Sequence, residues 1–396
     1  MTDSKRDIWN DDDGARVEKK QGGGPRRFGL FLLVLVLVLG VVAAAAYRDG
    51  TGFDVLRRRL NYRNLPSSGS QTSYQYDASA QNRYADLDGT LVVLSDTRIQ
   101  VLGGQGEEIW AEDVSMKHPA IHQGGGRAVA YDVGGTELYV VDGAGELLHL
   151  TNKEAEPLIC ARLNEDGWLA VTAERQGYKG AVTVYNASLS KPSFVFNSAD
   201  RFVTDACVGR NGRYMAAVTL GQESGTFVSS IVLYSMTEEE PMASYDVSDG
   251  LAAAIAEQDG RLVTVSDTCL TLAGSNGEVT GTYRYGDAFL RGYALGGEDF
   301  SALLLNRYQS GSVGRLVTVD GKGEAIASLE VTQEVLDISA AGRYLAVLYT
   351  DRLVVYNRDL QVYAALNGTD YAGSVIMRRD GAALLLSADA GRLFLP

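Results

Sequence analysis

Short apolar runs and glycine turns alternate along most of this chain, from Tyr84 to the C-terminus. One unit consists of an apolar run, a glycine turn, an apolar strand, a loop and a second strand that ends in Tyr, Leu or Val. Two clear copies are NGRYMAAV, which begins at Asn211, and AGRYLAVL, which begins at Ala341. Strand-forming units of about forty residues are typical of β-propellers, in which each unit is one blade.

A glycine marks the first turn of each unit. Tight hairpin turns need a positive φ, which glycine adopts without strain. The strands that follow, such as LAVTA and LAVLY, are continuous apolar runs, as expected for strands covered on both faces by neighbouring blades. The pattern predicts an all-β fold with a single propeller of eight four-stranded blades, or seven if one degenerate unit is miscounted. The turn glycines are Gly89, Gly126, Gly167, Gly212, Gly260, Gly297, Gly342 and Gly381.

The last unit ends at residues 393–396, after its third strand. A candidate strand, Ser73–Asp77, precedes the first unit. An open sheet edge invites aggregation, so the ring is expected to close. We therefore predict that residues 74–396 form the propeller and that its N-terminal strand completes the last blade.

Residues 28–46, FGLFLLVLVLVLGVVAAAA, carry no charged side chain. A helix rises about 1.5 Å per residue, so this length matches a hydrocarbon core of roughly 30 Å. The segment is predicted to be a transmembrane helix that acts as a signal anchor. A cleaved signal is the alternative, because Ala44 and Ala46 fit a small-x-small pattern. Residues 1–27 are polar and charged, and they are predicted to be a disordered cytoplasmic tail.

The charges that flank the apolar segment bear on its orientation. Five Lys and Arg residues precede the segment closely and five follow it, so the count alone does not decide. Arg26 and Arg27, however, directly abut the apolar run, as in the n-region of a signal sequence. We expect a single-pass protein of the cell membrane with a cytoplasmic N-terminus and an extracytoplasmic propeller.

Residues 47–73 are predicted to be a juxtamembrane stalk. Within it, residues 53–62 could form an amphipathic surface helix whose arginines meet anionic headgroups. The other interpretation is a solvated linker, which the composition of Pro66–Ser70 favours.

The charge of the chain is uneven. Residues 1–73 carry 12 Lys and Arg against 8 Asp and Glu, whereas residues 74–396 carry 24 against 42. A domain with a net charge of −18 repels phosphate backbones, so no nucleic-acid partner is expected.

Candidate chemistry is sparse, and no catalytic, cofactor-binding or metal-binding residue is predicted. His118 and His122 are four residues apart, but Pro119 between them excludes a helical metal pair. The three cysteines are unevenly spaced and odd in number, unlike a disulfide framework. A bridge between Cys160 and Cys207 is conceivable, because both fall on neighbouring first strands, but small core residues are the simpler interpretation.

The chain resembles an uncharacterised, domain-of-unknown-function family of membrane-anchored β-propeller proteins from clostridial-type Gram-positive bacteria. LDGTLVVLSDTRIQVL from Leu87, GYKGAVTVYN from Gly177 and VTLGQESGTFVSSIVLY from Val218 carry the resemblance, together with the apolar anchor. The resemblance implies a fold and a location but no activity. More distantly, the repeat is similar to WD-repeat and quinoprotein propellers, without the Trp-Asp dipeptides of the former or the tryptophan pattern of the latter.

Three loops are longer than a turn requires: residues 174–180, 221–229 and 307–314. Aromatic and arginine side chains in such loops are typical binding anchors. We therefore predict a non-enzymatic binding or scaffolding module with a protein or ligand partner at the cell envelope. An enzyme with an active site at the channel mouth, quinoprotein-like or hydrolase-like, is the alternative. The identity of the partner and the oligomeric state do not follow from the sequence. The predicted partner-binding residues are Arg175, Tyr178, Lys179, Gln222, Phe227, Arg307 and Tyr308.

Overall fold

The structure is a computed structural model of the 396-residue chain, and it describes residues 24–48, 54, 57, 58, 62 and 69–396 except 239, 248 and 249. The described residues fall into two units, residues 1–53 and 54–396. Residues 1–23 of the predicted tail and most of the predicted stalk lie outside the described residues. Residues 24–27, which were predicted to be part of the disordered tail, instead belong to a helix.

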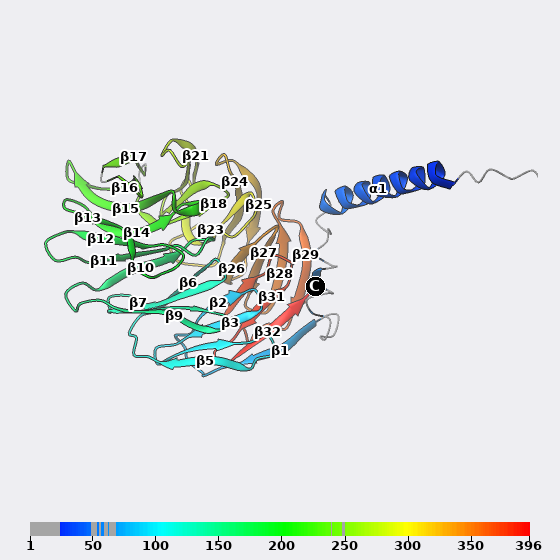
Figure 1. Cartoon of the computed structure of the whole chain (residues 1–396), viewed down its shortest axis with the longest axis horizontal. Coiled ribbons are helices and arrows are strands. Elements are labelled where there is room, and N and C mark those ends of the chain that lie inside the picture. Colours follow the sequence, from blue (N-terminus) through cyan, green and yellow to red (C-terminus); the bar gives the residue numbers. More distant parts are fainter. Residues whose placement is uncertain are drawn as a thin grey trace, which may run out of the picture. The chain divides into compact units, whose positions relative to one another are not determined.

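The first unit contains a single described helix, α1 (Gly24–Arg48), which includes the predicted apolar segment (Figure 1). Its side chains from residue 29 to residue 42 are exposed. Within the described part of the chain, no helix has both the length and the apolar character needed to cross a membrane.

The second unit contains eight four-stranded antiparallel sheets, which confirms the predicted eight-bladed propeller (Figure 1). We number the blades along the chain and the strands within a blade from the first to the fourth. Blade 1 consists of β2 (Arg83–Leu87), β3 (Thr90–Leu94), β4 (Arg98–Leu102) and β5 (Glu108–Asp113), and blade 2 of β6 (Pro119–Gly124), β7 (Arg127–Asp132), β8 (Glu137–Asp142) and β9 (Gly145–Thr151). Blade 3 consists of β10 (Leu158–Leu163), β11 (Leu169–Ala173), β12 (Gly180–Tyr185) and β13 (Pro192–Ser198), and blade 4 of β14 (Phe202–Val208), β15 (Tyr214–Glu223), β16 (Thr226–Ser235) and β17 (Pro241–Asp246). A short 3-10 turn, Arg210–Gly212, joins β14 to β15.

Blade 5 consists of β18 (Ala252–Gln258), β19 (Arg261–Ser266), β20 (Cys269–Ala273) and β21 (Val279–Arg284). Blade 6 consists of β22 (Phe289–Ala294), β23 (Phe300–Asn306), β24 (Gly314–Asp320) and β25 (Ala325–Val331), and blade 7 of β26 (Val335–Ala341), β27 (Tyr344–Tyr349), β28 (Arg352–Asn357) and β29 (Val362–Asn367). Blade 8 consists of β30 (Ser374–Met377), β31 (Ala383–Leu386), β32 (Ala390–Leu395) and β1 (Gly69–Gln75).

Blade 8 therefore joins the two ends of the propeller. Strand β1 pairs antiparallel with β32, and Tyr74 lies opposite Gly391. The closing strand begins at Gly69, earlier than the segment Ser73–Asp77 that the sequence favoured. The Tyr74 hydroxyl donates a hydrogen bond to the Gly89 carbonyl of blade 1, at 3.2 Å, so the closing strand also contacts the first blade.

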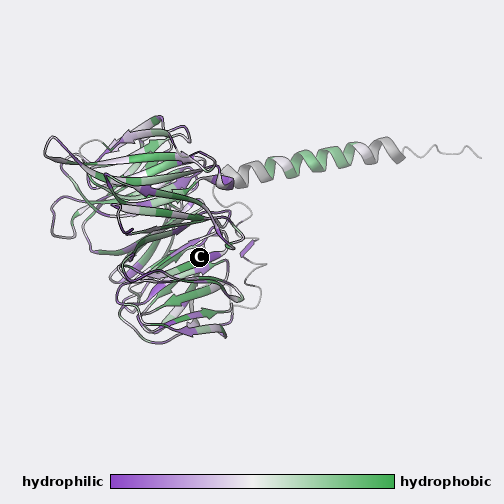
Figure 2. Ribbon diagram, turned by 60° about the vertical axis from the view of Figure 1, so that its left-hand side comes forward, coloured by the Kyte–Doolittle hydropathy of each residue, from purple (hydrophilic) through white to green (hydrophobic). Residues whose placement is uncertain are grey.

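The core lies between the blades. The second and third strands are buried along nearly their whole length, as in β3 and β27, because neighbouring blades cover both of their faces. The fourth strands alternate between exposed and half-buried residues, because one of their faces meets solvent. Figure 2 shows hydrophobic colouring along the strands inside the blades and hydrophilic colouring on many of the loops.

Seven of the eight predicted turn glycines have a positive φ, from +56° at Gly342 to +112° at Gly89. The prediction was wrong for Gly297, whose φ is not positive. In the turn of blade 6, Asp299 takes the left-handed conformation instead, with a φ of 60°. Gly297 is needed for another reason: a Cβ at this position would lie 2.5 Å from the Phe300 carbonyl oxygen.

The chain reverses at every strand, so the connections lie at two opposite faces of the ring. The turns after the first and third strands of each blade form one face, which we call the turn face. The connections after the second and fourth strands form the other, which we call the loop face. The loops predicted to bind a partner follow second strands, and they therefore belong to the loop face.

The described stalk residues of the second unit pack on the turn face of blades 7 and 8. Arg58 is 8% exposed, and its guanidinium donates hydrogen bonds to the Asp380 carbonyl at 2.6 Å and to the Tyr363 hydroxyl at 2.8 Å. Asp54 accepts a hydrogen bond from the Tyr344 hydroxyl at 2.8 Å. Asp54, Arg57 and Arg58 have helical conformation, in line with the predicted helix of residues 53–62. The Arg58 guanidinium, however, is bound by the propeller and not by solvent.

Candidate binding face and channel

Exposed apolar side chains gather on the loop face. Among the described residues, nine large apolar side chains at loop connections or at the adjacent strand ends are at least 38% exposed. The other exposed large apolar side chains of the propeller lie on the fourth strands, apart from Tyr293 on β22. Such a collection on one face is typical of interaction sites. The nine residues, from blade 2 to blade 7, are Val133, Tyr178, Phe202, Phe227, Leu251, Phe289, Tyr308, Val313 and Leu336.

Three of these side chains, Tyr178, Phe227 and Tyr308, were predicted partner-binding residues, and they are 48%, 60% and 63% exposed. The sequence analysis missed the others. Phe202 and Phe289 are the first residues of the first strands β14 and β22, positions where the strand pattern alone predicts partial burial. The sequence does show that each of these two aromatic residues directly follows a loop. That position indicates an exposed binding residue only when the neighbouring blades and their loops are also known.

The loop of residues 174–179 in blade 3 contacts blade 4. The Lys179 ammonium lies 5.1 Å from the centre of the Phe202 ring, a cation–π distance. The Arg175 side chain is half-buried and pairs with Glu156 at 3.5 Å. Tyr178 and Lys179 are exposed, so these two of the three predicted residues are available to a partner.

The segment of residues 221–229 is a hairpin rather than a loop, which corrects the sequence prediction. Strands β15 and β16 extend through it, with Gln222 opposite Phe227, and the turn is only Ser224 and Gly225, both with a positive φ. Arg201 holds this hairpin from the side, because its guanidinium donates to the Val228 carbonyl at 2.5 Å and to Glu223 at 2.9 Å. Phe227 is therefore exposed on a hairpin whose position is fixed by the hydrogen bonds of Arg201.

The loop of residues 307–313 in blade 6 is closed at its base. The Arg307 amide donates to the Val313 carbonyl at 2.9 Å, and the Asn306 side chain donates to the Gly311 carbonyl at 2.7 Å. The Arg307 guanidinium is exposed and lies 3.8 Å from Glu330, a surface pair of small energetic value. Tyr308 stands at the exposed start of this loop.

The predicted residues thus lie on one face but not in one cluster. The loops of blades 3 and 4 are adjacent, whereas the loop that carries Arg307 and Tyr308 belongs to blade 6. Leu251 at the start of blade 5 lies between them and continues the apolar surface. The arrangement suits a broad contact with a macromolecule better than a single small-molecule site.

The channel wall contains a buried polar network that the sequence analysis missed. The Arg162 Nε donates to both Asp205 carboxylate oxygens, at 2.7 and 2.9 Å. The Cys160 thiol donates to the same carboxylate at 3.0 Å. Burial lowers the pKa of Arg162, but the adjacent Asp205 carboxylate raises it further, and the net effect is an increase. The cluster therefore contains a stable ion pair.

The cysteines are all free thiols, so the conceivable bridge between Cys160 and Cys207 does not form. Cys207 and Cys269 are buried core residues, as the simpler interpretation expected. Cys160 instead joins the polar network. Burial, followed by the negative charge of Asp205, raises the pKa of its thiol to about 12, so it is protonated at neutral pH.

The two histidines of the His-x-x-x-His spacing have separate environments. His118 is exposed, and its Nδ1 lies 3.3 Å from the Val133 carbonyl oxygen at a loop. His122 lies in the channel wall, where its Nδ1 accepts a hydrogen bond from the Leu163 amide at 3.2 Å. Burial, followed by the positive charge of Arg162, lowers the pKa of His122 to about 3, so this imidazole is neutral. Among the described residues, no group of three or more His, Cys, Asp or Glu side chains is arranged to hold a metal ion.

Solved structures share this fold at low sequence identity. The C-terminal WD40 domain of Sif2 matches with 14% identity and a TM-score of 0.59, over 83% of this chain and 99% of that domain. BamB from Moraxella catarrhalis matches with 12% identity and a TM-score of 0.54, over 82% and 100%. The computationally designed Ika8 protein matches with 12% identity and a TM-score of 0.61, over 82% and 99%. These likenesses support the propeller fold.

At the sequence level, no curated protein is significantly similar to this chain. Residues 61–364, which include most of the propeller, match a family of unknown function, DUF5711. This agrees with the resemblance to a domain-of-unknown-function family of propellers, while the membrane anchoring and clostridial origin that the resemblance implied stay predictions. The match covers well over half of the chain, and the chain therefore belongs to the DUF5711 family.

Proposed function

We propose that this protein is a non-enzymatic binding or scaffolding module that holds a protein partner on its loop face at the cell envelope. The observation that carries the proposal is the collection of nine exposed apolar side chains on the loop face, from blade 2 to blade 7. Propellers with this fold are commonly protein-interaction modules. Apolar surface gains free energy when a partner removes it from water, by about 25 cal/mol per Å².

We further propose that residues 28–46 anchor the protein in the cell membrane, with the propeller outside. This part of the proposal is supported by the uncharged run of 19 residues and by the Arg26-Arg27 pair beside it. The packing of Arg58 on the turn face fits the same arrangement, because the chain reaches the propeller at the face opposite to the proposed binding surface. A partner then approaches the loop face without obstruction by the stalk.

Site-specific photo-crosslinking in intact membranes tests the proposal. A photoreactive residue replaces Phe227 or Tyr308 on the loop face, and Lys322 or Glu298 on the turn face serves as the matched control. All four side chains are exposed, so none of the replacements disturbs the core. We expect one crosslinked protein shared by the two loop-face positions and absent from the turn-face positions. Identical crosslinks from both faces would overturn the assignment of the binding face.

A further inference from the structure

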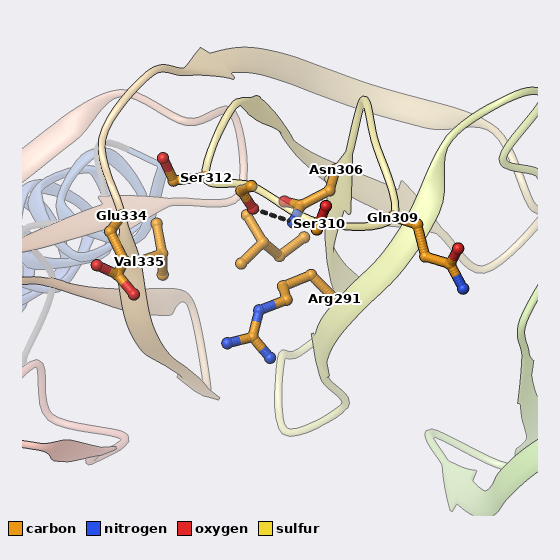
Figure 3. Close-up of a pocket in the computed structure, with 9 residues that line it drawn as sticks. Arg291, Asn306, Gln309, Ser310, Ser312, Glu334 and Val335 are labelled. Carbon is orange, nitrogen blue, oxygen red and sulfur yellow. Dashed lines mark hydrogen bonds between the residues drawn. The ribbon is translucent and has the colours of Figure 1, made fainter.

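A polar cavity of about 500 Å³ opens between blades 6 and 7 at the loop face (Figure 3). Its size is within the range of about 300–1,000 Å³ that is usual for small-ligand sites. Leu304 and Val335, both buried, contribute its apolar surface. Arg291, Asn306, Ser310 and Glu334 supply polar groups.

Arg291 reaches this cavity because of a β-bulge. The register between β22 and β23 shifts between Leu290 and Gly292, so Arg291 is the extra residue of the bulge. Bulges often redirect a side chain next to a functional site. Four other first strands have a bulge in the corresponding pairing, and their extra residues are uncharged: Ile159, Thr204, Ala253 and Leu336. Blade 6 alone places a charge at this position among the five.

The Arg291 and Glu334 side chains are both exposed and have no charged partner among the described residues. Neither side chain makes a hydrogen bond or an ion pair with another described residue, and they make none with each other. The contrast with Arg162 is clear, because that inner-strand arginine is neutralised by Asp205 of the next blade. In Figure 3 the Arg291 guanidinium points away from the loop that carries Ser310 and toward the side on which Glu334 lies.

The remaining wall of the cavity is held in place. Asn306 is 6% exposed, and its side-chain amide donates to the Gly311 carbonyl, which fixes the loop over the cavity. This loop is also closed by the hydrogen bond from the Arg307 amide to the Val313 carbonyl. A preformed wall lowers the entropic cost of binding, because the loop does not have to become ordered when the ligand binds.

We propose that this cavity binds a short zwitterionic peptide of about dipeptide size, with its carboxylate on Arg291 and its ammonium group on Glu334. A simple anion would meet the Glu334 carboxylate in an acidic domain, and a simple cation would meet the Arg291 guanidinium. The pair of opposite charges therefore selects a ligand that carries both. Charge-assisted hydrogen bonds at each end supply the affinity and fix the orientation of the peptide. The site is independent of the proposed partner, because a cavity of this size takes a small ligand without any protein bound to the loop face.

The test uses dialanine and two capped forms of it with the purified full-length protein in detergent. N-acetylated dialanine lacks the ammonium group, and dialanine amide lacks the carboxylate. In a ligand-observed NMR titration, we expect dialanine to bind with a Kd on the order of 1 mM and each capped form to bind at least fivefold more weakly. R291Q should bind dialanine and dialanine amide equally, and E334Q should bind dialanine and its acetylated form equally.

The matched controls are K322Q and E298Q, which remove one charge of each sign from exposed positions on the turn face. Both controls should keep the full preference of the wild-type protein for dialanine. Absence of saturable binding of dialanine to the wild-type protein would overturn the proposal. It would also be overturned if R291Q and E334Q discriminated among the three peptides as the wild-type protein does.

Discussion

The Arg162 Nε of blade 3 donates to both carboxylate oxygens of Asp205 in blade 4, at 2.7 and 2.9 Å. The same carboxylate accepts a hydrogen bond at 3.1 Å from the Ile255 amide of blade 5. One side chain thus links the inner strands of three consecutive blades. Asp205 is 3% exposed, so its interactions replace those that water would otherwise make.

Replacement of Asp205 by alanine should destabilise the propeller strongly. The change leaves the half-buried Arg162 guanidinium without its counter-charge, and loss of one partner of a buried pair typically costs about 3–5 kcal/mol. Chemical denaturation measures the loss as a change in the free energy of unfolding. The control is D113A, which removes an exposed carboxylate 3.4 Å from Arg98 and should cost less than about 1 kcal/mol. Equal losses in the two variants would contradict a structural role for the buried pair.

Acidification should destabilise the protein through His122. The pKa of this imidazole is about 3 in the folded protein and about 6.5 in an unfolded chain. Between these values the unfolded chain binds a proton that the folded protein does not. The contribution is therefore fully present above about pH 6.5 and is lost as the pH falls toward 3.

The variant H122Q tests this pH dependence, because glutamine can accept the hydrogen bond from the Leu163 amide but does not titrate. Between pH 7 and pH 5, its free energy of unfolding should fall by about 1–2 kcal/mol less than that of the wild-type protein. The difference is kept at this size because the His122 ring is only half-buried and faces the channel. The control Q105A changes an exposed side chain that does not titrate, and it should follow the wild-type pH profile. A wild-type profile for H122Q would exclude this mechanism.

The closing strand should be needed for stability. Tyr74 on β1 is 2% exposed, and it packs in the core between blades 8 and 1. Truncation to alanine removes a buried aromatic ring and should cost about 3–5 kcal/mol. The neighbouring Gln75 is exposed on the same strand, so Q75A should change the stability by less than about 0.5 kcal/mol. If thermal denaturation gave the same Tm for Y74A and Q75A, β1 would not contribute to the folded ring.

The loop face should lose its partner when three of its exposed aromatic side chains are replaced together. The triple variant Y178S, F227S and Y308S removes interface anchors but no core residue, so partner capture should be abolished while the Tm stays unchanged. The matched control replaces Ile109, Met242 and Val362 by serine, since these apolar side chains are exposed on fourth strands. Co-purification after crosslinking measures capture. Unaltered capture by the loop-face variant would move the binding site to another surface.

The proposed topology makes the propeller accessible from outside the cell. Protease treatment of intact cells with an opened wall should degrade residues 74–396 while sparing residues 1–27, because the membrane shields the cytoplasmic tail. An immunoblot with tags at both ends of the chain distinguishes the two parts. Survival of the propeller under these conditions, together with its digestion after membrane lysis, would contradict the topology.

The sequence alone determined the propeller and favoured eight blades over seven, because the blade is a local unit. A strand, a glycine turn and a second strand follow each other within a few residues, and their pattern depends on short-range rules of φ and burial. The exceptions show the limit of this reasoning. Gly297 has the right place in the pattern, but the glycine is required by the nearby Phe300 carbonyl rather than by a positive φ. Likewise, polar residues near Ser224 fit either a loop or an extended hairpin.

Only the tertiary structure decided which side chains meet across blades. Arg162 and Asp205 are 43 residues apart, and Arg58 lies 322 residues from Asp380. Neither of these separations along the chain corresponds to a repeating pattern of residues, because each contact depends on how whole blades pack. The same reason explains the apolar loop face and the cavity at Arg291. The sequence specifies the blades one by one, whereas the surfaces that can bind a ligand exist only after the ring has closed.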